Sequence, residues 1–214
     1  MTKTILAFGD SNTYGSPPMK AHATPRPRFP RGTRWPTVVA EKTGWEVIEA
    51  GLPGRTATAQ TDVLMGTYVG GPTGLRVAIN SCGPIDALVI MIGTNDQKAQ
   101  FGLSPEAIAG AVSALVSIAK SEEIQNKHGG FEILLVCPPA VKEIGLLKED
   151  FRGAEAKSAV IPALLAALAD SWDIDYLNAN TVISCSDEEG VHIDAESHKA
   201  LGQAICAGLR ASLV

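Results

Sequence analysis

Residues 1–15 read MTKTILAFGDSNTYG and join a short apolar run to an abrupt turn. The run Ile5–Phe8 predicts a buried strand that stops at Gly9. Ser11 follows just beyond it, and ligands of open α/β sheets bind in the crevice outside the carboxyl ends of the strands. Ser11 is therefore a candidate nucleophile. The alternative is that Ser11 only caps a following helix, as serine often does.

The remainder of the chain alternates apolar strand patterns with helical ones. Four more strands are expected within residues 45–50, 87–92, 131–136 and 174–177. Helices are expected over residues 35–42, 74–80, 104–123, 154–172 and 195–209. Such alternation indicates right-handed crossovers and a parallel sheet. At 214 residues, an α/β protein with one domain over residues 1–214 is the simplest interpretation.

Composition excludes several classes of partner. The formal net charge is −5, which offers no basic surface for nucleic acid or for an anionic membrane. No apolar run approaches the roughly 18 residues that span a bilayer, and Ile5–Phe8 is too short for a signal peptide. The four cysteines lack metal-ligand spacing, so we expect reduced thiols in a cytoplasmic protein, although they could also form two disulfides.

Residues 16–36 form a compositional anomaly next to Ser11. They contain six prolines and four arginines, which predicts a long irregular loop. The loop could wall the crevice, meet a neighbouring subunit or be a mobile surface segment. Tyr14, Phe29 and Phe101 are candidates for lining an acyl pocket.

Four turns at strand ends carry complementary chemistry. Ser11, Gly54 and Asn95 follow the first three strands and His192 follows the fifth, so a parallel sheet brings them to one edge. Serine needs a base to take its proton, and histidine titrates near neutrality. Attack on an ester creates an oxyanion. The backbone N–H groups of Ser11 and Gly54 and the side-chain amide of Asn95 are natural donors to it.

A catalytic histidine also needs a group that fixes its tautomer. Glu189, three residues before His192, can supply that carboxylate. Asp187 in the same acidic run is a rival. A third interpretation makes the run a solvated loop and leaves His192 to backbone carbonyls.

Other polar residues near these turns are assigned structural roles. We expect Asp10 and Asp96 to brace their turns through hydrogen bonds. His198 lies on the last predicted helix and is expected to be a packed or capping histidine. His22 and His128 lie in polar loop contexts and are expected to be exposed.

The motifs at residues 9–12 (Gly-Asp-Ser-Asn), 54 (Gly), 93–96 (Gly-Thr-Asn-Asp) and 189–192 (Glu-Gly-Val-His) resemble the four blocks of the SGNH (GDSL-type) hydrolases. The resemblance runs from Ile5 to about Gly202. Gly-Thr-Asn-Asp is the most specific block. The family pattern has aspartate where this chain has Glu189, whose side chain is one methylene longer.

Finer features resemble the arylesterase/acyltransferase branch of that family, namely residues 11–15, 34–35, 49–56 and 90–98. The resemblance implies a three-layer α/β/α flavodoxin-like sandwich on a five-stranded parallel sheet, with no metal or other cofactor. It also implies a small-molecule ester substrate with a short acyl chain, acyl transfer to alcohols and a homo-oligomer. Carbohydrate acetylesterase, lysophospholipase and thioesterase activities are alternatives within the superfamily. A non-catalytic flavodoxin-like binding module is the alternative from another class.

Overall fold

The computed structural model describes residues 2–22, 25–59 and 66–213. Within them, five strands form one sheet in the order β2-β1-β3-β4-β5. Every neighbouring pair is parallel, as the alternating pattern predicted. The strands are β1 (Thr4–Gly9), β2 (Glu46–Gly51), β3 (Ala87–Met91), β4 (Glu132–Cys137) and β5 (Asp175–Asn178).

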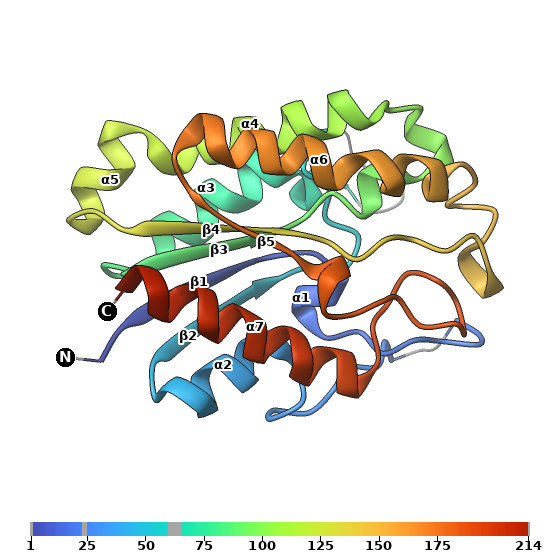
Figure 1. Cartoon of the computed structure of the whole chain (residues 1–214), viewed down its shortest axis with the longest axis horizontal. Coiled ribbons are helices and arrows are strands. Elements are labelled where there is room, and N and C mark those ends of the chain that lie inside the picture. Colours follow the sequence, from blue (N-terminus) through green and yellow to red (C-terminus); the bar gives the residue numbers. More distant parts are fainter. Residues whose placement is uncertain (1, 23–24, 60–65, 214) are drawn as a thin grey trace.

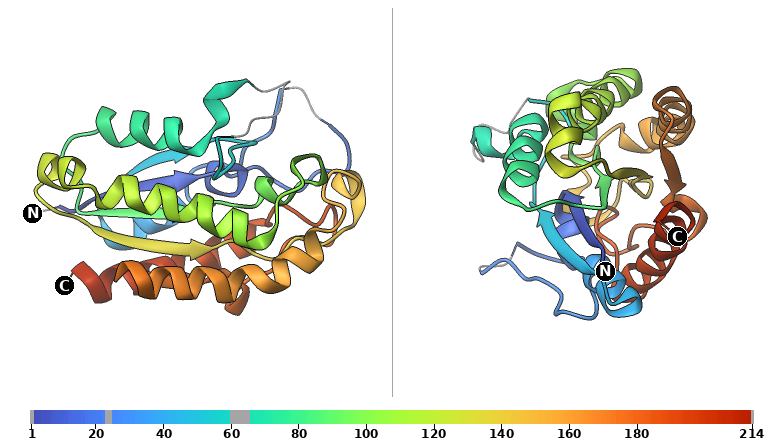
Figure 2. Two further views of the ribbon diagram at one scale, coloured as in Figure 1. Left: turned by 90° about the horizontal axis from the view of Figure 1, so that it is seen from above. Right: turned by 90° about the vertical axis from the view of Figure 1, so that its left-hand side faces the viewer.

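Helices cover both faces of the sheet, which confirms the three-layer sandwich (Figures 1 and 2). One face carries α3 (Gly71–Ser81), α4 (Pro105–Lys120), α5 (Glu122–His128) and α6 (Ala154–Trp172). The other carries α2 (Trp35–Thr43) and α7 (Ala195–Leu213). The short helix α1 (Ser11–Tyr14) lies at the end of β1. Short 3₁₀ turns occur at Thr67–Val69, Asn95–Gln97, Ala99–Phe101, Gly145–Leu147 and Ala179–Thr181.

The apolar run in β1 reflects burial on two sides. Leu6 and Phe8 pack in the core beneath α3, α4 and α6, whereas Ile5 and Ala7 pack toward α2 and α7. Successive side chains of a strand point to opposite faces, so a strand covered on both sides reads as continuously apolar. The central strand β3 is wholly buried for the same reason.

Local signals locate most helix ends. As predicted, α2 has Pro36 in its first turn and ends at Gly44, which takes the left-handed conformation with φ 72°. The predicted helix over 104–123 is wrong at its end. At Ser121 the backbone turns extended, with ψ 142°, and its hydroxyl donates to the carbonyl of Ile118, so α5 begins separately.

The carboxyl ends of all five strands lie at the edge of the sheet away from both chain termini (Figure 1). The turns that carry the candidate site residues therefore share that end of the molecule. Among the described residues, no helix combines the length and apolar character needed to cross a membrane. All four cysteines are unpaired thiols.

Candidate active site

Ser11 is the first residue of α1 and faces a histidine from the other end of the chain. Its Oγ lies 2.9 Å from Nε2 of His192. The interpretation of Ser11 as a helix cap is wrong, because the capping side chain is Asp10, whose Oδ1 accepts the backbone N–H of Asn12 at 2.9 Å. The Ser11 hydroxyl is thereby left to the histidine.

Glu189 is the carboxylate that contacts His192. Its Oε1 lies 2.7 Å from Nδ1 of the ring and also accepts the backbone N–H of His192 at 2.6 Å. The side chain of Glu189 thus bends back to the backbone of His192, which accommodates its one additional methylene relative to aspartate. Glu189 is fully buried, whereas the side chain of Asp187 is 89% exposed and pairs with Lys142. Of the three partners considered for the histidine, the structure brings Glu189 to it.

Asn12 holds the histidine segment and was not singled out from the sequence. Its Nδ2 donates to the carbonyl of Val191 at 3.1 Å, and its Oδ1 accepts the N–H of Ile193 at 3.2 Å. Asn12 is fully buried. The residues on both sides of His192 are therefore tied to the residue after Ser11. The only signal in the sequence was the position of Asn12 in the first motif, because its partners lie about 180 residues away.

Three candidate N–H donors belong to residues that line one cavity, namely Ser11, Gly54 and Asn95. Ser11 begins α1, where the N–H groups have no acceptor within the helix. Gly54 lies in a turn after β2 with φ 83°, a conformation that glycine adopts without strain. Asn95 donates one side-chain N–H to the carbonyl of Arg55 at 3.0 Å, which fixes the amide and leaves its second hydrogen.

The predicted bracing roles of Asp10 and Asp96 are confirmed. Asp96 accepts the backbone N–H groups of Ala57 at 2.8 Å and Thr58 at 2.9 Å, and so holds the segment after Gly54. Burial raises the pKa of Asp10 to about 6 and also raises the pKa of Asp96, in each case against the effect of the hydrogen bonds that they accept.

Arg55 is the buried cation of this region. Its Nη1 donates to the carbonyl of Gly9 at 2.9 Å and to that of Ala50, and its guanidinium carbon lies over the ring of Phe8, 4.4 Å from the centroid. Burial lowers its pKa to about 10, although the nearby Asp10 acts in the opposite direction. Arg55 thus ties the ends of β1 and β2 together beneath the candidate site.

The remaining histidines differ in their surroundings. His198 is packed as predicted: it is fully buried, its Nδ1 accepts the N–H of Trp35 at 3.3 Å, and burial lowers its pKa to about 3. The expectation that His128 is exposed is wrong. It is 5% exposed, because the end of α5 packs inward and Nδ1 of His128 accepts the N–H of Ile85. His22 is exposed, as expected.

A cavity of about 350 Å³ opens beside Ser11 and His192. The loop over residues 16–36 supplies part of its wall, which was one of the predicted alternatives. Tyr14, Phe29 and Phe101 do not line it; among the described lining residues, Phe151 supplies the phenylalanine ring. The lining residues are Ser11, Ser16, Met19, His22, Arg26, Pro53, Gly54, Asn95, Lys98, Leu147, Asp150, Phe151, Val191 and His192.

Residues 7–200 match the model of the GDSL-like Lipase/Acylhydrolase family. The chain is similar to the structure of Est24, a carbohydrate acetylesterase from Sinorhizobium meliloti, with 31% identity, a TM-score of 0.90 and coverage of 99% of this chain and 100% of the other. It is equally similar to the native aryl esterase of M. smegmatis, with 32% identity, a TM-score of 0.90 and the same coverage. No curated protein matches the chain by sequence.

Proposed function

The chain belongs to the GDSL-like lipase/acylhydrolase family, and we propose that it is a serine esterase that cleaves short-chain acyl esters through an acyl-enzyme on Ser11. One observation carries the proposal. The Ser11 hydroxyl lies 2.9 Å from one nitrogen of His192, and the buried Glu189 lies 2.7 Å from the other. A nucleophile, a base and a group that orients the base are thereby in contact.

The first half of the reaction forms the acyl-enzyme. His192 takes the proton of Ser11 as Oγ attacks the carbonyl carbon of the ester. The carbonyl oxygen becomes negative and accepts hydrogen bonds from the N–H groups of Ser11 and Gly54 and from the amide of Asn95. His192 then gives its proton to the departing alcohol oxygen, and the acyl group remains on Ser11.

The second half releases the acyl group. Water, or a second alcohol, loses a proton to His192 and attacks the acyl carbon, after which the proton returns to Ser11. Glu189 stabilises the imidazolium that forms in both halves and keeps the proton on Nδ1, so that Nε2 faces Ser11 as an acceptor.

The cavity supports a small ester as the substrate. Its volume of about 350 Å³ is at the lower end of the range for small-molecule sites, and Phe151 and Leu147 give it an apolar part suited to an aryl or short alkyl group. A carbohydrate acetyl ester is the second candidate. The similarity to Est24 favours it, as do the polar side chains Lys98 and Asp150 in the lining.

Replacing the nucleophile tests the proposal. With p-nitrophenyl acetate as substrate, Ser11→Ala should lower kcat by a factor on the order of 10⁶, because the covalent route is lost. A Ser184→Ala variant, which removes an exposed hydroxyl, is the control and should retain the wild-type rate. Fluorophosphonate labelling followed by mass spectrometry should place the adduct on Ser11.

Equal rates in wild type and Ser11→Ala would refute the mechanism. A wild-type protein that takes no phosphonate label and hydrolyses no ester would instead favour the non-catalytic binding module. A panel of p-nitrophenyl acetate, acetylated sugars, lysophospholipids and thioesters, compared by kcat/KM, separates the candidate substrates.

A further inference from the structure

The proline- and arginine-rich loop leaves α1 and returns to it. The N–H of Phe29 donates to the carbonyl of Gly15 at 2.8 Å, and Nε of Arg28 donates to the carbonyl of Tyr14 at 2.7 Å. These two bonds close the loop on the helix that begins with Ser11. Four described side chains between them line the cavity, namely Ser16, Met19, His22 and Arg26.

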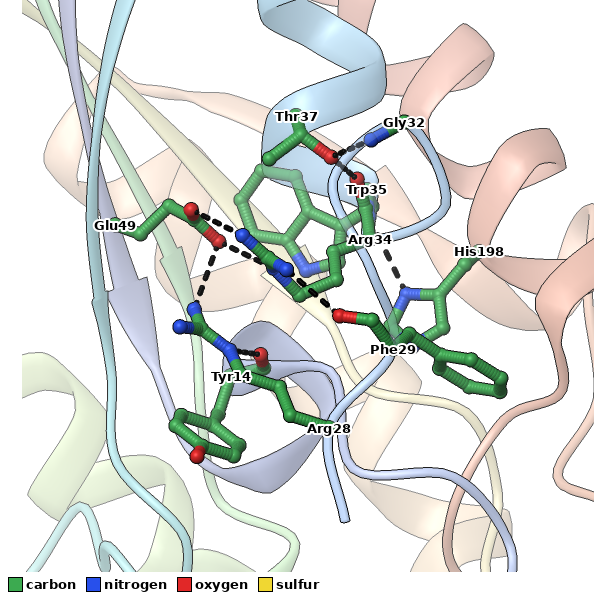
Figure 3. Close-up of polar contacts among 9 residues, drawn as sticks. All are labelled: Tyr14, Arg28, Phe29, Gly32, Arg34, Trp35, Thr37, Glu49 and His198. Atoms are coloured by element: carbon green, nitrogen blue, oxygen red, sulfur yellow. Dashed lines mark hydrogen bonds and ion pairs between the residues drawn. The ribbon is translucent and has the colours of Figure 1, made fainter.

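The carboxylate of Glu49 in β2 anchors the part of the loop that returns to α1 (Figure 3). It accepts hydrogen bonds from Nε of Arg34 at 2.8 Å, from Nη2 of Arg34 at 2.7 Å and from Nη2 of Arg28 at 3.0 Å. The third nitrogen of Arg34, Nη1, donates to the carbonyl of Phe29 at 2.7 Å. The guanidinium of Arg28 also lies over the ring of Tyr14, 4.3 Å from its centroid. We call Glu49, Arg28 and Arg34 the clamp.

The geometry of the clamp makes it a strong anchor. Arg34 meets Glu49 through two parallel N–H···O bonds, the bidentate pairing in which arginine is most specific. Arg34 is only 5% exposed, so its charge depends on Glu49 for compensation. Loop residues that are proline cannot donate backbone hydrogen bonds, so the loop depends more than most on side-chain anchors.

We propose that Glu49 is a positioning residue: through Arg28 and Arg34 it fixes the loop that walls the cavity, and so sets the affinity and acyl-chain preference of the site. The inference rests on the proposed esterase function. Glu49 does not line the cavity, and it contacts neither Ser11 nor His192. Its loss should therefore weaken substrate binding and leave the chemical step intact.

Glu49→Gln tests this because it removes the charge and one of the two acceptor oxygens and keeps the size. For p-nitrophenyl acetate we expect KM to rise by about three- to tenfold and kcat to stay within about twofold. This pattern indicates a loss of binding that affects the bound substrate and the transition state equally. The ratio of kcat/KM for p-nitrophenyl acetate to that for p-nitrophenyl hexanoate should also shift by about threefold or more, since the wall that limits the acyl chain is loosened. Glu46→Gln, an exposed change on the same strand, is the matched control and should match wild type.

Hydrogen exchange supplies a readout that does not depend on turnover. The amide of Phe29, which closes the loop onto Gly15, should exchange faster in Glu49→Gln than in Glu46→Gln. Arg28→Gln is a milder second variant, because it leaves the Arg34–Glu49 pair in place and Arg28 is exposed. Arg28→Gln should also raise KM, by a smaller factor than Glu49→Gln. If Glu49→Gln does not fold, Arg28→Gln tests the role of the clamp by itself.

The outcomes separate this inference from the function on which it rests. An active wild type whose KM, acyl-chain preference and Phe29 exchange are unchanged in both variants would overturn the role of the clamp alone. Faster exchange with unchanged kinetics would also overturn it, because the loop would then not set the cavity. A wild type without esterase activity would refute the proposed function itself.

Discussion

Glu189→Gln, compared with Asp187→Asn, separates the roles of the two carboxylates that the sequence offers as partners of His192. Both substitutions exchange a carboxylate oxygen for an amide nitrogen in the same loop. Their surroundings differ: Glu189 is fully buried against the histidine ring, whereas the side chain of Asp187 is 89% exposed and pairs with Lys142.

The magnitude follows from the contacts of Glu189. Its Oε1 is 2.7 Å from Nδ1 of His192 and also accepts the backbone N–H of that residue at 2.6 Å. A glutamine that turns its oxygen to this position keeps both hydrogen bonds but loses the charge opposite the imidazolium. A glutamine that turns its nitrogen there opposes the backbone N–H and donates to Nδ1, which puts the ring proton on Nε2. A ring in that tautomer cannot accept the proton of Ser11. The corresponding Asp-to-Asn change in serine proteases lowers kcat about 10⁴-fold through the wrong tautomer, or about 5.5 kcal/mol of barrier, and we take that loss as the upper limit for Glu189→Gln.

Asp187→Asn should leave kcat within about twofold, because an exposed ion pair contributes only about 0.2–1 kcal/mol and Asp187 does not contact His192. The assay is kcat for p-nitrophenyl acetate, with thermal unfolding of each variant to show that it is folded. Full activity in Glu189→Gln would remove Glu189 from the mechanism. A large loss in Asp187→Asn alone would transfer the role to Asp187.

Two further predictions concern Asn95 and His198. Asn95→Ala removes one oxyanion donor and should lower kcat about 10²–10³-fold, equivalent to about 2.7–4 kcal/mol; a kcat within a few-fold of wild type would exclude Asn95 from that role. Burial lowers the pKa of His198 to about 3 in the folded protein, whereas the same histidine has a pKa of 6.5 in the unfolded chain. Below pH 6.5 the unfolded chain therefore binds a proton that the folded protein does not, and stability falls as the pH drops. The free energy of unfolding in urea should therefore fall between pH 7.5 and pH 5, and the fall should be about 2 kcal/mol smaller in His198→Gln than in wild type. An equal fall in both proteins would contradict the buried neutral state of His198.

Much of the fold could be predicted because its signals are local. The apolar runs of β1 and β3 and the Pro36 and Gly44 that bound α2 each depend on a few contiguous residues. The parallel topology then places the ends of these strands at one edge, which brings Ser11 near His192 without any knowledge of side-chain packing. Errors arose where packing overrides local composition, as at the buried His128.

Only the tertiary structure decided which polar side chains contact one another. The sequence offered Glu189, three residues before His192, with Asp187 in the same acidic run as a rival, and the burial of Glu189 and the exposure of Asp187 distinguish them. The hydrogen bonds from Asn12 to the His192 segment and from Glu49 to the arginines of the loop join residues far apart in the chain. The sequence by itself determined the strands, the turns and the reactive groups that they carry. The contacts that distant residues make with those groups depend on side-chain positions that packing fixes, so they leave no local pattern in the sequence.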